Sequence, residues 1–389
     1  MLGKNKINLF VLFSILFCFF FFLPLSSVSA QSELEELKQR IEQLEGKVEK
    51  QEKEQKDILG KLSENITITG AIELDYTYKD PSSTTVANSD STSNLDIGTV
   101  QLGVEAKFHE WVTGNFVLKG ENLDDGTNDR VFWDEATITI QKEGFPLYFV
   151  GGKRGQPFGV FNSHLISDPI TKDCYEVAKS GATIGFTPDL LGLDMSATVY
   201  KGEVLADKLS GASYGWARDP APNPDPTDNV DSYVLNVSIA PIEGLNLSTY
   251  FDSEPGQGSR NETAGGTIEY QIGIFTFDAE YVAALEREKN APDNKEYKES
   301  AWFGAIACQV IDPLEIALRY EAFDDDKSGN QDGSLENRYS VGANYKLFEK
   351  DNFTTTLMLE YRRSNYEKAA GSTVDDTVDE VFARVAIEF

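Results

Sequence analysis

Apolar and polar residues alternate with a period of two from Ile66 onward. In residues 66–78 every second residue is apolar or aromatic except Gly70, and threonines and acids fill most of the positions between. A β-strand with this pattern has one apolar and one polar face. Similar segments recur along the rest of the chain and predict sixteen strands, at 66–78, 97–108, 112–121, 132–141, 147–154, 178–187, 193–203, 231–240, 245–253, 264–273, 274–284, 299–310, 313–323, 336–347, 353–366 and 379–389.

The connections between these segments alternate in length. Those after even-numbered strands are short turns, such as 109–111 and 311–312, whereas those after odd-numbered strands are long: 79–96, 122–131, 155–177, 204–230, 254–263, 285–298, 324–335 and 367–378. Bacterial outer-membrane barrels have short periplasmic turns and long extracellular loops. Residues 65–389 therefore predict an all-β membrane domain, a sixteen-stranded antiparallel transmembrane β-barrel with both of its ends on the periplasmic side. A soluble sandwich would need fewer strands and would bury their apolar faces in a core.

The last predicted strand supports an outer-membrane location. Its apolar face ends at Phe389 and consists of Val381, Ala383, Val385, Ile387 and Phe389. A final strand that ends in phenylalanine is the usual mark of substrates of the barrel-assembly machinery. We therefore expect that machinery, together with outer-membrane lipid, among the partners of the protein.

Two different patterns precede the barrel. Residues 1–30 contain Lys4 and Lys6, an apolar run and a small-residue exit at 28–30, which is the pattern of a secretory signal peptide. The alternative, a transmembrane helix, is disfavoured by Pro24 and by that exit. In residues 31–64, one heptad register holds the apolar residues Leu34, Leu37, Ile41, Leu44, Val48, Ile58 and Leu62.

This register predicts a periplasmic coiled coil over residues 31–64. An isolated helix of this composition is marginally stable in water, so it requires a partner. A homo-oligomeric stalk, with a trimer as the expected state, is favoured over a lone helix that folds back onto the barrel. A structural tether across the periplasm is a third function that this segment leaves open.

Composition narrows the function. The net charge is −29, and nucleic acid is an improbable partner because phosphate binding needs lysine and arginine. Cys174 and Cys308 fall at opposite ends of the predicted barrel, so no disulfide between them is expected. The mean hydropathy of −0.34 would suggest a soluble protein if the alternating pattern were ignored.

A barrel of sixteen strands leaves an aqueous lumen, and the predicted polar face carries both signs of charge. Its bases include Lys107, Lys119, Lys153, Arg319, Lys346, Arg362 and Arg384, and its acids include Glu73, Asp75, Glu105, Glu121, Glu269, Asp278, Glu280, Glu315, Glu321 and Glu360. Rings of charge in a pore select solutes by sign and shape. For any single residue, simple wetting of the lumen is the competing interpretation.

The sequence contains few residues that could form a catalytic site, and only two of them are histidines. Ser163, His164 and Asp168 are neighbours in a long loop, but adjacency in sequence is not the geometry of a catalytic triad. We therefore expect no enzyme activity, no catalytic residue and no cofactor. The segment 324–335 resembles a calcium loop through Asp324, Asp326 and Asp332, yet its twelfth position is Leu335, so a solvated acidic loop is favoured.

One dense motif carries a family resemblance. A Trp-Asp-Glu-Ala strand at 133–136 is followed by Gly-Lys-Arg-Gly-Gln-Pro-Phe-Gly at 152–159 and by Ile-Ser-Asp-Pro-Ile-Thr at 166–171. This run resembles the LbtU-type siderophore porins, which also combine a signal peptide, a coiled coil and a sixteen-stranded barrel. The resemblance implies diffusive passage of a ferric siderophore or a similar metal chelate across the outer membrane. A general or cation-preferring nutrient porin is the alternative. A TonB-dependent receptor is excluded, because such barrels have 22 strands and a plug domain.

The same motif suggests a pore constriction. Pro157 and Gly159 would fix a turn, Phe158 would anchor it, Lys153 and Arg154 end the preceding strand, and Asp168 begins the return. A loop that folds into the lumen would narrow the pore, whereas a loop packed on the outer rim would not. The candidate constriction or solute-binding residues are Lys153, Arg154, Pro157, Phe158, Gly159, Asp168, Arg319, Arg362 and Arg384.

Overall fold

The computed structural model describes residues 40–44, 46–47, 50, 65–82, 90–121, 123, 130–211, 229–256, 258–289, 294–326, 334–367 and 376–389. The chain divides into two units, Met1–Glu64 and Asn65–Phe389. In the first unit the described residues are helical, and Ile41 and Leu44 are exposed. The predicted signal peptide and most of the predicted coiled coil lie outside the described residues. No helix in the described part of the chain is both long and apolar enough to cross a membrane.

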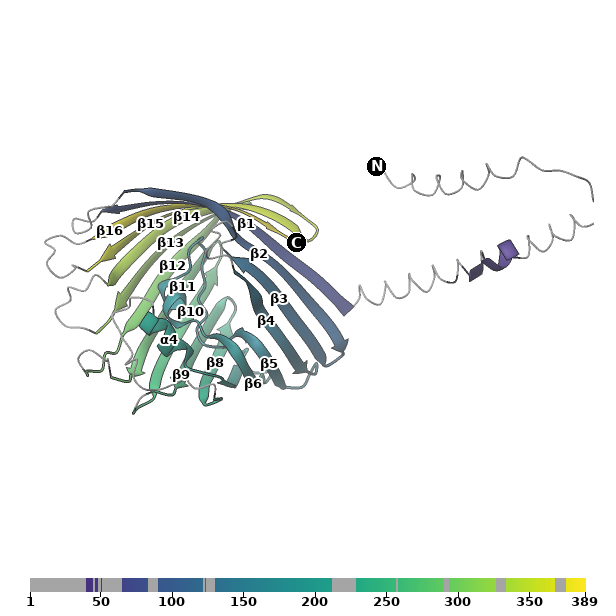
Figure 1. Cartoon of the computed structure of the whole chain (residues 1–389), viewed down its shortest axis with the longest axis horizontal. Coiled ribbons are helices and arrows are strands. Elements are labelled where there is room, and N and C mark those ends of the chain that lie inside the picture. Colours follow the sequence, from purple (N-terminus) through teal and green to yellow (C-terminus); the bar gives the residue numbers. More distant parts are fainter. Residues whose placement is uncertain are drawn as a thin grey trace, which may run out of the picture. The chain divides into compact units, whose positions relative to one another are not determined.

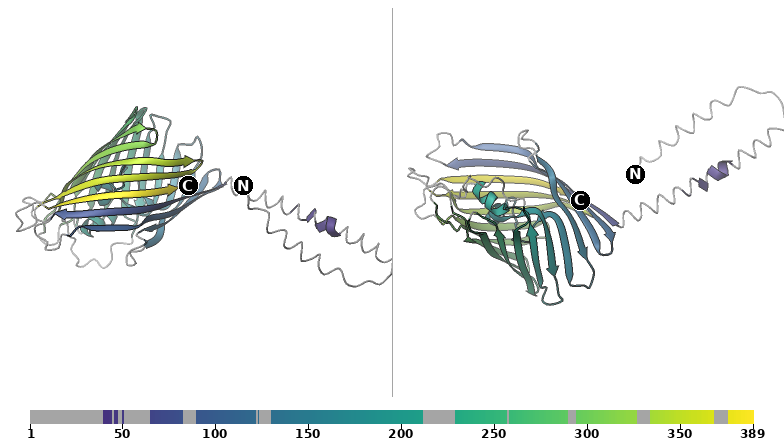
Figure 2. Two further views of the ribbon diagram at one scale, coloured as in Figure 1. Left: turned by 90° about the horizontal axis from the view of Figure 1, so that it is seen from above. Right: turned by 60° about the horizontal axis from the view of Figure 1, so that its bottom comes forward.

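The second unit is a closed barrel of sixteen antiparallel strands (Figures 1 and 2). Each strand pairs with its neighbours in sequence, and β16 pairs with β1 to close the barrel. The strands are β1 (Ile66–Ser82), β2 (Thr92–His109), β3 (Val112–Glu121), β4 (Arg130–Gln141), β5 (Leu147–Gly155), β6 (Ala178–Phe186), β7 (Asp194–Tyr200), β8 (Ser232–Ile242), β9 (Leu245–Glu254), β10 (Asn261–Ile272), β11 (Phe275–Glu286), β12 (Ser300–Ile311), β13 (Leu314–Asp324), β14 (Leu335–Lys350), β15 (Phe353–Tyr366) and β16 (Thr377–Glu388).

The predicted number, order and pairing of the strands are confirmed. Most boundaries agree to within three residues; the largest differences are that β2 begins earlier, at Thr92, and β1 ends later, at Ser82, and β7 also ends earlier, at Tyr200. The early end of β7 has a local cause. Gly202 has a φ of 92°, and the chain turns there into helix α4 (Val204–Gly211). An alternating pattern does not reveal such a departure, because it carries no information on where the chain leaves the wall.

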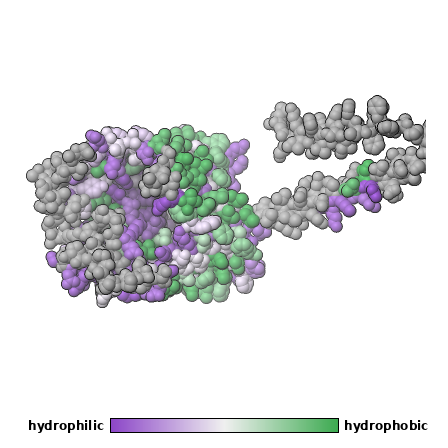
Figure 3. All heavy atoms as spheres, in the orientation of Figure 1, coloured by the Kyte–Doolittle hydropathy of each residue, from purple (hydrophilic) through white to green (hydrophobic). Residues whose placement is uncertain are grey.

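The alternation separates the two faces of the wall as predicted. Large apolar side chains such as Ile72, Leu74, Ile306 and Leu318 are exposed on the outer surface. Figure 3 shows hydrophobic residues over the outer side of the barrel and hydrophilic residues in its interior. This distribution explains the low mean hydropathy, because lipid contact needs only one residue in two to be apolar.

The closing seam between β1 and β16 explains why Gly70 interrupts the apolar face of its strand. The backbone N–H of Gly70 donates to the carbonyl of Phe389 at 2.9 Å, and the N–H of Phe389 donates back at 3.0 Å. A β-carbon on Gly70 would lie 2.5 Å from the ring of Phe389. The glycine therefore provides the space in which the aromatic ring covers the seam. On the lumen side, Arg384 binds both oxygens of Asp75 at 2.7 Å.

We expect Gly70→Val to destabilise the seam by roughly 1–3 kcal/mol, the usual cost of overpacking. The added side chain must displace the ring of Phe389. The measurement is resistance of the folded barrel to heat or urea, read from its electrophoretic mobility. Phe389→Ala in the Gly70→Val background should recover part of the loss, and strictly additive effects would show that the two residues do not interact.

Candidate channel constriction

The connection between β5 and β6, here called the inner loop (residues 156–177), is folded into the barrel. Three of its backbone N–H groups donate to carboxylates on the lumen face of distant strands. Val160 donates to Glu280 at 2.9 Å, Ser167 to Glu360 at 2.8 Å, and Ile170 to Glu321 at 3.0 Å. The acceptors belong to β11, β15 and β13. The inner loop, which joins β5 to β6, therefore crosses the lumen to the part of the wall formed by β11 to β15.

A tight turn at the start of the inner loop directs the chain inward. Phe158 N–H donates to the carbonyl of Gln156 at 2.7 Å, and Gly159 has a φ of 84°. This left-handed conformation favours glycine. The ring of Phe158 is fully buried, and its centroid lies 4.9 Å from that of Tyr250 on β9 in an edge-to-face arrangement. The turn thus fixes the direction of the loop, and the phenylalanine anchors it to the wall.

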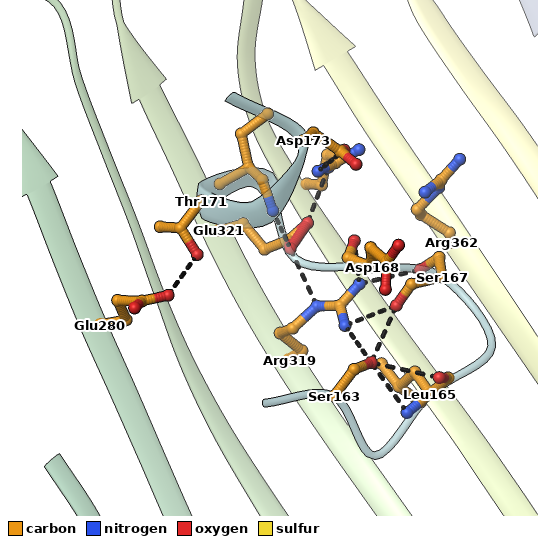
Figure 4. A network of polar contacts seen from close by, with 12 residues as sticks. Ser163, Leu165, Ser167, Asp168, Thr171, Asp173, Glu280, Arg319, Glu321 and Arg362 are labelled. Atoms are coloured by element: carbon orange, nitrogen blue, oxygen red, sulfur yellow. Dashed lines mark hydrogen bonds and ion pairs between the residues drawn. The ribbon is translucent and has the colours of Figure 1, made fainter. Parts of the chain in front are cut away.

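Arg319 on β13 organises the middle of the inner loop (Figure 4). One terminal nitrogen of its guanidinium donates to Ser163 Oγ and to the carbonyl of Ser167, both at 2.9 Å. The other donates to Ser167 Oγ at 2.8 Å and to the carbonyl of Asp168 at 3.1 Å. Its Nε lies 2.9 Å from a carboxylate oxygen of Glu321. Only the planar fork of arginine can serve this many acceptors from one side chain.

A short helix, α3 (Ile170–Tyr175), forms the returning half of the inner loop. Glu321 accepts from the backbone of Ile170, and Glu280 accepts from Thr171 Oγ1 at 2.6 Å. Arg338 on β14 then joins the helix to the wall, since it donates to Glu321 at 2.7 Å and to Asp173 at 3.0 Å. Each polar group of the helix that faces the wall therefore meets a charged partner, as burial inside the barrel requires.

His164, in the middle of the inner loop, lies between two acids of the wall. Its Nε2 is 2.9 Å from Asp278 on β11, and its Nδ1 is 3.2 Å from Glu315 on β13. Hydrogen bonds to these two carboxylates raise the pKa of His164 to about 9, against the opposing effect of burial. The imidazolium form is therefore present at neutral pH, and it carries a proton on each of the two nitrogens that the acids require.

An apolar cluster inside the barrel supports the inner loop from behind. Helix α4, from the connection between β7 and β8, packs beside α3, and Lys208 on α4 donates to the carbonyl of Lys172 at 2.9 Å. The cluster contains Phe158, Ile170, Cys174, Tyr175, Val177, Tyr200, Leu205, Ala206, Leu209, Val234, Tyr250, Val282, Ala301 and Phe323. One side of the lumen is thus filled by packed side chains.

The structure brings several of the predicted site residues together. Pro157, Phe158 and Gly159 form the turn, and Asp168 belongs to the segment held by Arg319, which binds its carbonyl. Arg362 and Arg384 lie on the wall beyond it, where Arg362 pairs with Glu380 at 2.8 Å and Arg384 pairs with Asp75. Arg154 donates to Thr183 on β6 at 2.9 Å. Lys153 alternates with Arg154 along β5 and reaches the carbonyl of Trp133, so it does not face the inner loop.

The sequence predicts that the wall acids line the lumen, but it does not predict that they bind the inner loop. Glu280, Glu321 and Glu360 were expected to face solute, yet each is buried and accepts hydrogen bonds from loop residues. Arg338 and helix α4 were missed altogether. A surplus of acids on strands far from the Pro-Phe-Gly turn was the available signal, but spacing alone does not show which strands a loop crosses.

The other residues considered for chemistry are the two cysteines and the acidic segment 324–335. Cys174 is buried in α3, and neither it nor Cys308 forms a disulfide within the described part of the chain. Asp324 accepts from the backbone of Asp326 at 2.9 Å, but Asp332 lies outside the described residues. Within the described ranges, no group of three or more histidines, cysteines and acids is arranged to hold a metal ion. The calcium loop therefore stays a prediction.

A family model described as Gram-negative porin matches residues 26–369 of the chain. The chain belongs to this family. The match supports an outer-membrane location and a channel-like fold in a family that is in general not enzymatic. It is a match to the porin family, and membership of the LbtU-type subfamily stays a prediction.

Individual relatives are distant. A UPF0422 protein of Coxiella burnetii is 23% identical over 304 residues, which cover 72% of this chain and 61% of the relative, so the chain spans about three fifths of that protein. Among solved structures, the outer membrane channel DcaP of Acinetobacter baumannii has a TM-score of 0.60 at 11% identity, over 82% of this chain and 96% of that one. OmpF of Salmonella typhi, solved in complex with daunomycin, has a TM-score of 0.57 at 13% identity, over 84% and 98%. These similarities show the fold alone.

We expect Arg319→Met to release the middle of the inner loop while the barrel still forms. A hydrogen bond to a charged group contributes about 1.5–3 kcal/mol, so losing one of them raises the undocked fraction roughly tenfold or more. Single-channel recording should show larger current fluctuations. Arg362→Met is the control, because it removes an arginine of the same wall whose bonds are to Glu380 on β16. Equal fluctuations in both variants would contradict the assignment.

The His164 contacts predict a pH dependence. The pKa of His164 is raised from 6.5 to about 9 in the docked loop. The protonated side chain therefore stabilises the docked loop fully at pH values below 6.5, and this stabilisation is lost as the pH rises through about 9. Current fluctuations should therefore increase as the pH is raised past about 9. In His164→Asn this step should be absent and the fluctuations should be raised already at neutral pH. A wild-type channel without that step would refute the proposed role of His164 in holding the inner loop.

Proposed function

We propose that this porin is a diffusive outer-membrane channel whose aperture is set by the inner loop. The observation that carries the proposal is the attachment of this loop to β11, β13 and β15 through Glu280, Glu321, Arg319 and Glu360. A segment held in this way narrows one side of the lumen permanently and needs no energised plug. Solutes then pass between the loop and the opposite wall.

The charges around this passage favour a polar solute that carries both donors and acceptors. Asp168 and Asp173 keep partly exposed carboxylates on the inner loop. Arg384 on β16 pairs with Asp75 and Glu73 on β1, and the charge of Asp168 also acts on it. Opposed charges of this kind orient a dipolar solute in a narrow pore. A ferric siderophore or a similar metal chelate is the solute class that we propose, on the strength of the motif resemblance.

A general or cation-preferring nutrient porin is the second candidate. The observation that favours it is the net charge of −29, which attracts cations to the whole protein. Trimer formation through residues 31–64, a periplasmic position for that segment and recognition of Phe389 by the barrel-assembly machinery belong to the same proposal. One solved relative, OmpT of Vibrio cholerae, is described in a trimer form.

Liposome swelling distinguishes the two candidates. Purified protein should admit a ferric siderophore faster than uncharged sugars of similar size. Equal rates would reject the chelate and leave the general porin. Asp168→Asn and Arg384→Gln should each reduce the difference between the solutes without closing the channel, because they remove charges of opposite sign. Unchanged selectivity in both variants would reject the proposed role of these charges.

A further inference from the structure

A buried cluster beneath helix α4 contains two carboxyl groups that share one phenol. The hydroxyl of Tyr200, at the end of β7, lies 2.6 Å from Asp252 Oδ2 and 2.7 Å from Glu254 Oε1. Asp252 and Glu254 are two residues apart on β9 and therefore point to the same side of the wall. All three side chains are fully buried. The cluster takes no part in holding the inner loop to the wall acids described above.

The hydrogen count of this cluster requires an additional proton. A phenol has one hydrogen and can donate it to only one of the two carboxyl groups. The second short contact is a hydrogen bond only if the other carboxyl group is protonated and donates to the phenol oxygen. Two ionised carboxylates at these distances would leave one oxygen–oxygen contact without a hydrogen, in surroundings where an unpaired charge is most costly.

The remaining contacts indicate which carboxyl group holds the proton. Both oxygens of Glu254 accept backbone N–H groups at the start of α4, from Leu205 at 2.9 Å and from Ala206 at 3.0 Å. The N-terminal end of a helix stabilises a negative charge. Asp252 Oδ2 contacts the hydroxyl of Tyr200, whereas its Oδ1 is buried with no hydrogen-bond partner among the described residues. These contacts favour an ionised Glu254 and a neutral Asp252.

The neighbouring cations do not bind Asp252 directly. Arg287 makes its hydrogen bonds to Glu299, Thr263 and backbone carbonyls, and Arg260 makes its own to Ser253 and to the carbonyl of Asp231. Their charges act on Asp252 only at a distance. Burial and the nearby Glu254 both oppose ionisation of Asp252, and no described cation forms a bond that would reverse this.

We propose that Asp252 is a neutral carboxylic acid that, with Tyr200 and Glu254, forms a proton-dependent latch holding α4 inside the barrel. Loss of the proton places two carboxylates around a single phenol and weakens the attachment of α4. Leu205 and Leu209 then leave the apolar cluster, and α3 loses the support of Lys208. Loss of this proton at alkaline pH thus weakens the support of the inner loop from a site that is remote from it.

Infrared difference spectroscopy of the purified full chain tests the protonation directly. At neutral pH, the spectrum of the wild type minus that of Asp252→Asn should contain the C=O stretch of a protonated carboxyl group. The matched control is Asp194→Asn, because Asp194 also accepts from a tyrosine, Tyr148 at 3.0 Å, but shares that phenol with no second acid. Its difference spectrum should lack the band. Absence of the band for Asp252, or its presence in both spectra, would overturn the proposal.

The buried thiol of Cys174 reports whether the proton holds α4. In a chain with Cys18→Ser and Cys308→Ala, Cys174 should react slowly with a thiol reagent until the pH removes the infrared band, and then at least tenfold faster. Asp252→Asn keeps a donor beside the phenol and should remain slow over the same pH range. If the variant becomes reactive at the same pH as the wild type, the latch is rejected. Conductance at neutral pH stays the same in either case, so failure here leaves the proposed channel function intact.

Discussion

The fold of the lumen depends on one requirement, which is that a loop inside a barrel must find partners for its backbone polar groups. The strands cannot supply them, because their own N–H and C=O groups are used in the closed ladder. Side chains of the wall must therefore do so. Glu280, Glu321 and Glu360 accept from the inner loop, and Arg319 donates to its carbonyls. Without these charged residues at lumen-facing positions, the inner loop would be better solvated outside the barrel.

This requirement also explains why the wall charges serve two purposes. Those on β11 to β14, together with Glu360 on β15, are buried beneath the inner loop and contribute mainly to its position. Arg362 on β15, Arg384 on β16 and Asp75 on β1 instead form ion pairs along the wall outside this contact. The apolar cluster with α4 reinforces the same division, because it fills the space behind the loop. The charges that hold the inner loop and the ion pairs outside it therefore lie mainly on different sectors of one wall.

The strand pattern could be predicted from sequence because it depends on local alternation and on lipid facing every strand. The seam follows from the same logic, and even the exception at Gly70 has its reason in the ring of Phe389. The contacts of the inner loop could not be predicted, since they join residues more than 100 positions apart, as in Thr171 and Glu280. Helix α4 was hidden for a related reason. Its stability depends on tertiary capping by Glu254 rather than on a strong helical pattern of its own.

The most direct test is a disulfide between the inner loop and the wall. A β-carbon placed on Gly342 of β14 would lie 2.5 Å from a methyl carbon of Leu165, so Leu165→Cys and Gly342→Cys should come close enough to bond. In a chain whose native cysteines are replaced, this pair should cross-link in folded barrels in the membrane, as judged by mass after proteolysis. Leu165→Cys with Thr139→Cys on β4 should not. Failure of the first pair to cross-link, with both thiols open to a soluble reagent, would contradict a loop fixed inside the lumen.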